Sequence, residues 1–333
     1  MAVFPTTGAF TTSPEYTGSF IPQLWSNKLN AKFFASTMMT EIANTDWEGE
    51  IKNQGDTIRI RTAPSITIND YTGAGSTLTS EVPTPIFADM QIDKGKYFSV
   101  QVNDVLAHQA DMDLMNMFTD DAAKQLKIAI ENDCFFQWFV TEGPDAANAG
   151  ITAGALSAEY NLGSDAVPIN QATPANVLQT ILRMSAALDE QNVPEEGRWL
   201  IISPFDRQLL MQTDIAQAYF TGDAASTIRT GKIGMLDRFD VYVSNLLPKG
   251  TTDKLMVPGL TPVASGGADV GAKPRRMMVA GTKHSCAFAA QISKTEPLRN
   301  QTDFGDIVRG LSVYGRKVVK DTALVTALVG DPT

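Results

Sequence analysis

The clearest pattern of hydrophobic and polar positions lies between residues 111 and 141 and predicts one long helix. Apolar residues recur four apart from Leu114 through Phe118 onward, which places a narrow apolar stripe on one face of the helix. From Cys134 nearly every position is apolar, and Gly143 with the proline after it ends the pattern. We expect such a helix to lie along the body of the protein with its last turns sunk in a core.

Strict alternation of apolar and polar residues predicts the two strands of a long antiparallel ribbon before this helix. Ile58 and Ile60 alternate with Arg59 and Arg61, and alternation resumes between residues 91 and 103. Ile66 and Ile68 also alternate with polar neighbours, and the stretch 71–87 that follows is rich in turn residues and has no periodicity. Because a lone ribbon is only marginally stable in water, it should lie on another surface.

Helical and strand patterns alternate after the long helix, which is typical of a domain that mixes helices with a sheet. A Thr-Pro pair at 173–174 and Ser203 begin two predicted helices, because these residue types favour helix starts. The predicted strands are 198–203, 239–244, 277–280, 287–292 and 307–314, followed by a turn at Gly315 and a last strand or helix at 318–329.

The composition and pattern of residues 1–45 predict an N-terminal arm. Residues 1–20, which include Phe10, are rich in threonine, serine, glycine and aromatic residues and carry few charges. A helical pattern follows from residue 22 to 42, with Trp25 on its apolar face. That face packs either on its own domain or on a neighbouring molecule, and the pattern does not distinguish the two.

Composition restricts the class of protein. Of 333 residues, 43% are hydrophobic and 19% are charged, so the chain should fold into two or three domains. The formal net charge of −10 argues against a general nucleic-acid binder, although an acidic chain with a mildly charged inner face can still lie near DNA. Two cysteines make no disulfide framework, no signal-peptide pattern is found, and no apolar run reaches the ~18–20 residues of a membrane span.

The sequence contains no strong catalytic or cofactor-binding motif. His108 and His284 are the only histidines, and their spacing does not fit a transition-metal site. The glycine-rich stretches lack the spacing of a phosphate-binding loop or a dinucleotide fingerprint, and no Gly-x-Ser-x-Gly motif occurs. An enzyme would have to rely on Asp206, His284 and Asp303 as a loose cluster. We therefore predict no catalysis, no cofactor and no metal.

Charged residues gather instead on the predicted ribbon and on the long helix. The basic residues of the ribbon are Arg59, Arg61, Lys94 and Lys96, and the acidic residues of the helix include Asp113, Asp120 and Asp121. These carboxylates fit a solvated helix face, a divalent-metal site, or pairing with the basic ribbon of a neighbouring copy. With Phe10 and Trp25 they are our candidates for contacts between copies, in which ion pairs would set register more than affinity.

Short segments spread along the whole chain form a series. In its first part they are 21–26 (IPQLWS), 32–33 (KF), 46–50 (DWEGE) and 55–61 (GDTIRIR). Later they are 197–204 (GRWLIISP), 231–234 (GKIG), 241–248 (VYVSNLLP), 308–311 (VRGL) and 314–318 (YGRKV). Their order resembles that of the major capsid proteins of tailed double-stranded DNA bacteriophages. One departure is at Asp237 and Arg238, where the family often has a glycine.

The resemblance implies the HK97-like capsid fold, in the α+β class. Its parts would be an N-terminal arm at 1–45, an extended β-hairpin loop at 46–105, a peripheral domain at 106–171 with a spine helix at 111–141, an axial domain at 172–285 and a return to the peripheral domain at 286–333. In this family the extended loop lies over the neighbouring subunit.

The resemblance also implies a function, which is self-assembly into the pentamers and hexamers of an icosahedral head that encloses double-stranded DNA. The implied partners are other copies of the chain, a separate scaffolding protein, a portal protein at one vertex, non-specifically packaged DNA and, in some relatives, a decoration protein, with no membrane. The protein would lie in the virion capsid after assembly in the bacterial host cytoplasm. The alternatives are an encapsulin-like compartment shell, a tail-tube or decoration protein and, from another class, a hydrolase with a mixed α/β domain.

Overall fold

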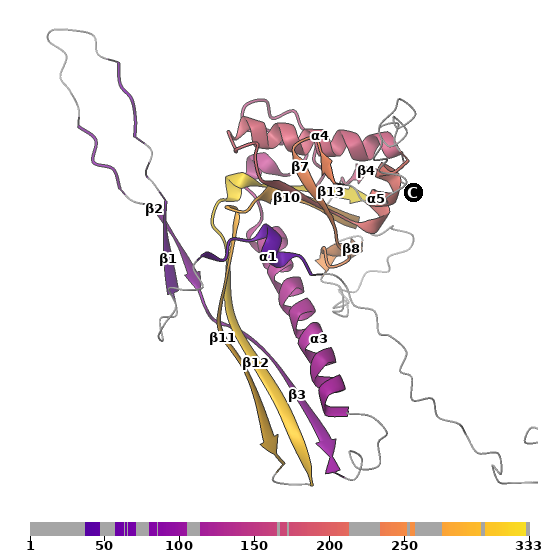
Figure 1. Cartoon of the computed structure of the whole chain (residues 1–333). Helices are drawn as coiled ribbons and strands as arrows, with labels where there is room; N and C mark the ends of the chain where they lie inside the picture. The colour runs from indigo at the N-terminus through magenta and orange to yellow at the C-terminus, as the bar shows by residue number, and fades with distance from the viewer. Residues whose placement is uncertain are drawn as a thin grey trace, which may run out of the picture.

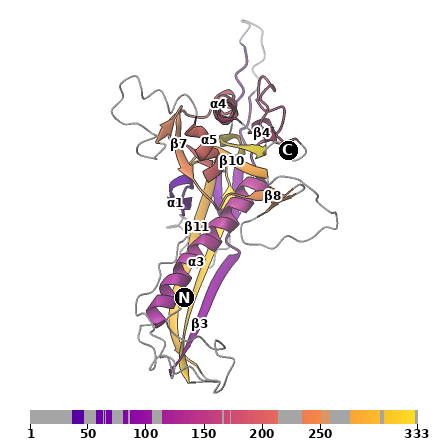
Figure 2. The ribbon, with the colours of Figure 1, turned by 90° about the vertical axis from the view of Figure 1, so that its right-hand side faces the viewer.

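The computed structural model describes residues 37–46, 57–62, 64, 66–70, 80–84, 86–104, 114–164, 167–171, 173–212, 234–251, 254–256, 275–300 and 304–330. Within these ranges the chain forms a three-stranded sheet, an eight-stranded sheet and a two-stranded ribbon. The three-stranded sheet and a long helix form an elongated lower part, and the eight-stranded sheet lies above them in a more compact part (Figures 1 and 2).

The three-stranded sheet is antiparallel and joins elements from distant parts of the chain. Its order is β11 (Cys286–Arg299), β12 (Gly305–Val318) and β3 (Lys94–Asn103). Helix α3 (Leu114–Phe136) runs beside it (Figure 1). Buried and exposed positions alternate along most of β12, with Tyr314 bonded to α3, so one face packs on the helix and the other faces away.

The predicted long helix is present as α3 and its continuation, the π-helix η2 (Gln137–Glu142). Gly143 ends it with a positive φ of 69°, as the sequence indicates, and its predicted start at 111–113 lies outside the described residues. The apolar end is sunk in a core, as expected. Its buried aromatic side chains are Phe135, Trp138 and Phe139.

The eight-stranded sheet forms the centre of the compact part. Its strands are β4 (Ile169–Asn170), β13 (Leu324–Gly330), β10 (Arg275–Thr282), β5 (Arg198–Ile202), β7 (Phe239–Val243) and β6 (Met235–Leu236) in spatial order, with β8 (Lys249–Thr251) paired to β10 and to β9 (Lys254–Met256). The predicted strand at 198–203 is thus central, between β10 and β7.

Helices cover both faces of this sheet, which explains why β5 reads as a continuous apolar run. Leu200 and Ile202 pack under α4 (Pro174–Glu190) and α5 (Pro204–Leu210). Trp199 and Ile201 point the other way, into the core that holds the end of α3 and α1 (Met39–Ile42). A strand buried on both sides needs apolar residues at every position.

The ribbon differs from the prediction in its second strand. It consists of β1 (Thr57–Thr62) and β2 (Ile86–Gln91), paired antiparallel. The alternating residues 94–103 form β3 instead, so Lys94 and Lys96 lie in the three-stranded sheet and not on the ribbon. A two-residue break at 92–93 separates the strands, and alternation alone does not reveal which strand each one pairs with.

The tail also differs from the prediction. Strand β12 continues through Gly315, where a turn was expected, and Gly315 pairs with Ala289 of β11. The glycine is needed there because a side chain would meet the backbone oxygen of Gln91 at 2.7 Å. After a short 3-10 helix, η5 (Asp321–Ala323), strand β13 joins the eight-stranded sheet between β10 and β4. The segment 286–333 therefore does not return wholly to the elongated part. A second 3-10 helix, η3 (Ala146–Asn148), follows η2.

Candidate assembly surfaces

The base of the ribbon is fixed to the body. Ile60 and Met90 are buried against Ala287 and Ala289 of β11, which makes a small separate core. From this base the ribbon extends away from the body in Figure 1. In the part of the chain that the structure describes, its apolar face has a partner within the subunit near this base.

Beyond β1 and β2 the ribbon carries apolar side chains into solvent. Ile66, Ile68 and Val82 are 65%, 89% and 84% exposed. The two segments are tied together where the backbone N–H of Thr67 donates to the Glu81 carboxylate at 3.0 Å. Large aliphatic side chains this exposed on a projecting element are typical of a contact with another molecule.

Arg59 is held within the ribbon itself. Its guanidinium donates to both oxygens of Asp89 on the opposite strand, at 2.9 and 3.1 Å, and lies 4.8 Å from the centre of the Phe87 ring. The hydrogen bonds from Arg59 lower the pKa of Asp89. Both charges are exposed, so the pair contributes little stability but fixes the register of the two strands.

The three-stranded sheet offers a partly apolar outer face, on the side away from α3. Tyr97 is 77% exposed, and Leu311 lies opposite it on β12. The face also holds an ion network in which Glu296 contacts Lys294 and Arg309. We call the shallow depression of about 540 Å³ around these residues the sheet patch.

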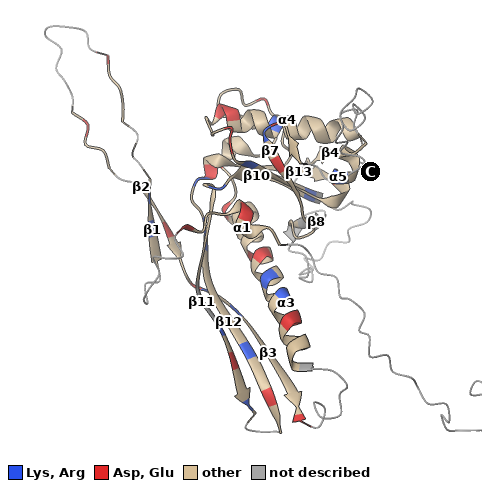
Figure 3. Ribbon diagram, viewed as in Figure 1, with Lys and Arg blue, Asp and Glu red and all other residues tan. Residues whose placement is uncertain are grey.

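The exposed face of α3 carries both signs of charge. Asp120 is exposed and Asp121 is half-buried, Lys124 follows about one turn later, and Lys127 follows about two turns later (Figure 3). Charges spaced three or four residues apart on a helix interact with one another. The described part of this face is therefore mixed, whereas the sequence analysis considered only its acidic residues.

The structure brings few of the predicted contact residues together. Arg61 is exposed on β1, Lys94 pairs with the neighbouring Asp93 at 2.8 Å, and Lys96 is half-buried on β3. Residues outside the described ranges are Phe10, Trp25 and Asp113.

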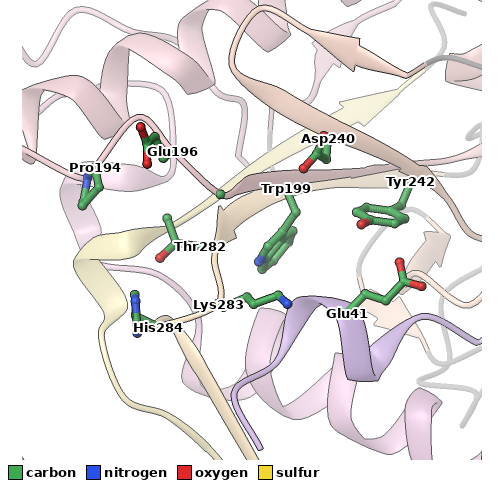
Figure 4. A pocket seen from close by; sticks show the side chains of 10 residues that line it. Glu41, Pro194, Glu196, Trp199, Asp240, Tyr242, Thr282, Lys283 and His284 are labelled. Carbon is green, nitrogen blue, oxygen red and sulfur yellow. The ribbon is translucent and has the colours of Figure 1, made fainter.

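The structure describes two members of the loose catalytic cluster and finds them in different surroundings. Asp206 is buried at the start of α5, where the Ser203 hydroxyl donates to it at 2.7 Å and Arg276 pairs with it at 3.2 Å. His284 is exposed on the turn after β10 and lines a different, open pocket of about 470 Å³ with Trp199 (Figure 4). Asp303 lies outside the described residues.

Asp206 fits a structural role. Burial raises the pKa of this carboxyl, and the charge of Arg276 with the hydrogen bonds around it opposes that effect. In the described part of the chain, no three His, Cys, Asp or Glu side chains are placed to hold a metal ion. Among the described helices, none is long and apolar enough to span a membrane.

Sequence reasoning missed the two features that the structure makes most prominent. The alternation at Ile66 and Ile68 was visible, but not that both side chains point into solvent. Glu131 interrupts the apolar half of α3, and the structure buries it almost completely. Glu131 follows the apolar Ile130 directly, and a carboxylate beside apolar positions of a helix was the available signal for a buried polar contact.

Comparisons with known proteins agree with this architecture. A model of the phage capsid protein family matches residues 88–327. A solved structure from Mycobacterium phage Che8 has 25% sequence identity and a TM-score of 0.70, covering 92% of this chain and 96% of that chain. The capsid of cyanophage P-SCSP1u has 13% identity and a TM-score of 0.68, covering 94% of each chain. The mature capsid of bacteriophage PhiM1 has 14% identity and a TM-score of 0.65, covering 97% of each.

No curated protein matches the sequence at a significant level. The two likenesses below 25% identity show the fold alone, but the family match spans well over half of the chain. It includes the three-stranded sheet, α3 and most of the eight-stranded sheet. The chain therefore belongs to the phage capsid protein family and has the HK97-like fold of a major capsid protein of the virion head.

Proposed function

We propose that copies of this chain form the pentamers and hexamers of a closed icosahedral head around double-stranded DNA, and that the chain catalyses no reaction. The observation that carries the proposal is the ribbon, which projects from the body with exposed aliphatic side chains (Figure 1). Such an element cannot bury its apolar surface within its own subunit and gains stability when it lies on another copy.

The sheet patch is the surface that best suits this ribbon. Tyr97 and Leu311 present apolar area beside charged side chains, and the ribbon carries Ile66 and Ile68 beside polar ones. An apolar centre with a charged rim is the composition of a specific protein interface. We place the ribbon of one copy on the sheet patch of its neighbour, in line with the resemblance.

The remaining partners are proposed from the resemblance. They are a separate scaffolding protein, a portal protein at one vertex, packaged DNA without sequence preference and, on the outside, a decoration protein. The domain division is also a proposal, with two boundaries adjusted to the sheets. The extended loop ends near residue 92, before β3, and strand β13 is assigned to the axial domain.

The test compares assembly of the wild-type chain with that of the double variant Ile66→Ser and Ile68→Ser. Burying one isoleucine side chain contributes about 1.5–3 kcal/mol, and each ~1.4 kcal/mol changes an equilibrium constant tenfold. We therefore expect at least a tenfold rise in the protein concentration needed for shells. Sedimentation velocity and negative-stain electron microscopy measure the assembled fraction.

Leu156→Ser is the matched control, because Leu156 is 84% exposed on a loop away from the ribbon. All three substitutions replace exposed residues, so the folding stability of each subunit should stay within about 0.5 kcal/mol of wild type. A wild-type chain that stays monomeric with and without a scaffolding protein contradicts shell formation. Equal assembly by both variants contradicts the role of the ribbon.

A further inference from the structure

Residues 37–46 form a strap that closes over the core between α3 and the eight-stranded sheet. The strap contains α1 and buries Met38, Ile42 and Ala43. At its far end, the backbone N–H of Asn44 donates to the carbonyl of Cys286 at 2.9 Å, and Phe288 donates back to Asn44 at 3.0 Å. This end is a one-residue β-bridge to β11.

The near end of the strap is held by a buried carboxylate. Glu131 of α3 is 1% exposed, and one of its oxygens accepts the backbone N–H groups of Met38 and Met39, at 2.9 and 3.3 Å. These donors begin α1, where a helix leaves its first N–H groups without partners inside the helix. The other oxygen of Glu131 has no hydrogen-bond partner among the described residues.

The charged groups around Glu131 have partners of their own. On the sheet side of α3, Arg316 pairs with Asp133 at 2.7 Å, and the Tyr314 hydroxyl donates to the same carboxylate. On the strap, the Glu41 carboxylate accepts the hydroxyl of Tyr242.

Two buried thiols complete the surroundings. Burial raises the pKa of Cys134 on α3 and of Cys286 on β11, so both stay neutral. Among the described residues, no counter-ion acts on Glu131. Burial raises the pKa of its carboxyl to about 7, against the opposing effect of the hydrogen bonds from Met38 and Met39.

We propose that protonation of Glu131 stabilises the closed strap, which therefore acts as a pH-dependent latch. Low pH favours the closed strap, and high pH favours the open strap. Closing the strap over an ionised Glu131 leaves a negative charge in an apolar core, whereas a protonated Glu131 is neutral there. When the strap opens, the carboxyl is exposed to water and its pKa returns to the ordinary value of a glutamate. The closed state therefore binds the proton more tightly than the open state.

The size of the effect follows from linkage. The closed-state pKa is about 7 and the ordinary value is 4.5, and each pKa unit changes the closing equilibrium tenfold. Full titration between these limits therefore changes the closing constant about 300-fold. Between pH 5.5 and pH 8.5, where the protein is easily handled, about 30-fold of that change remains. Closing is favoured throughout, because the strap also buries three apolar side chains.

The test uses the two cysteines as reporters of strap opening. Cys134 and Cys286 are the only cysteines of the chain, and both are fully buried in the core that the strap covers. An aromatic disulfide reagent reacts with them only when the core opens, so its rate reports the open population. The experiment compares wild type with Glu131→Gln from pH 5.5 to 8.5, using unassembled protein.

The ionisation of the thiols changes the reaction rate of wild type and of Glu131→Gln by the same factor at each pH. The ratio of the wild-type rate to the Glu131→Gln rate is therefore independent of thiol ionisation. We expect this ratio to rise about 30-fold over the range. Glu142→Gln is the matched control, because Glu142 accepts the backbone N–H of Val318 but also pairs with Lys317. The ratio of the wild-type rate to the Glu142→Gln rate should not change between pH 5.5 and 8.5. A flat ratio for Glu131→Gln as well would overturn the proposal, whatever the outcome for shell assembly.

Hydrogen exchange of the wild-type chain keeps the proposal testable if Glu131→Gln fails to fold. Amides of the strap should lose protection relative to those of α4 as the pH rises from 5.5 to 8.5. Both segments experience the same intrinsic change in exchange rate, so only their ratio carries the result. A constant ratio would overturn the proposal. Because no step depends on contact between copies, the latch and the proposed shell can fail separately.

Discussion

Asp189 contacts two arginines whose surroundings differ greatly. Arg198 is fully buried at the start of β5 and donates to the carbonyls of Val193 and Pro194 as well as pairing with Asp189 at 2.8 Å. Arg238 reaches the same carboxylate at 3.0 Å from the surface. The hydrogen bonds of the buried Arg198 hold the loop that contains Val193 and Pro194 in place. The ion pair of Arg238 with Asp189 is exposed, and water screens it.

The two arginines make a matched pair of variants. We expect Arg198→Met to lower the free energy of unfolding by about 2–4 kcal/mol, because it leaves the buried carbonyl of Val193 and the partly buried carbonyl of Pro194 without their donor. Arg238→Met should cost about 0.5 kcal/mol, since its ion pair is exposed. Urea unfolding of the unassembled chain measures both. Equal costs would show that the contact with Asp189, and not burial, decides the contribution of each arginine.

At the scale of elements, the local sequence pattern predicted whether a segment is a helix or a strand better than it predicted which element that segment packs against. The spacing of apolar residues predicted α3 and the central strand β5, because both patterns are set by their own neighbours. It could not predict that β3 pairs with β12 across more than 200 residues, or that β13 returns to the eight-stranded sheet. Alternation shows that one side of a strand is buried, and it does not identify the partner strand.

The pairing of β3 with β12 depends on a glycine. Gly310 lies opposite Phe98, and a methyl group added there would stand 2.3 Å from the aromatic ring. Gly310→Ala should therefore displace the ring and destabilise this sheet by about 1–2 kcal/mol. Gly95→Ala on the same strand pair is the control, because its added carbon would meet nothing closer than 3.9 Å.

Amide hydrogen exchange of β12 measures the local cost. Replacing Phe98 by leucine in the Gly310→Ala background should restore part of the protection, since the smaller side chain makes room for the methyl group. If Gly95→Ala and Gly310→Ala lower protection equally, loss of glycine flexibility and not the ring contact is the cause.

At the scale of the whole molecule, the family could be predicted from the order of short segments, whereas the contacts between copies stay a prediction. Some charges of the predicted ribbon–helix pairing already have neighbours of opposite charge within the subunit. Arg59 is bonded to Asp89, and Lys124 stands beside the acids of α3. Whether a surface residue is already paired depends on strand register and helix face, which single-residue types in a sequence do not specify.

The effect of salt on assembly distinguishes apolar contacts of the ribbon from ion pairs as the interaction that holds copies together. Each copy carries −10, so copies repel one another, and salt weakens that repulsion as the screening length falls from ~30 Å at 0.01 M to ~8 Å at 0.15 M. If apolar contacts of the ribbon hold the shell, the assembled fraction should rise between about 0.05 and 0.3 M NaCl. If ion pairs between copies hold it, the same change should lower the fraction. We expect the rise.

Charge-matched variants separate general repulsion from specific pairing on α3. Asp120→Lys with Asp121→Lys adds two charges at each position and takes the formal net charge from −10 to −6. Glu195→Lys with Glu196→Lys makes the same change on an exposed turn outside that helix, and it also removes the exposed ion pair of Glu195 with Arg238. If the face of α3 is only solvated, both variants should assemble more readily than wild type at low salt, and by similar amounts in light scattering. If the α3 variant alone fails to assemble while its unassembled chain keeps the wild-type urea midpoint, Asp120 and Asp121 meet a basic surface of the neighbouring copy, because lowered repulsion cannot reduce assembly.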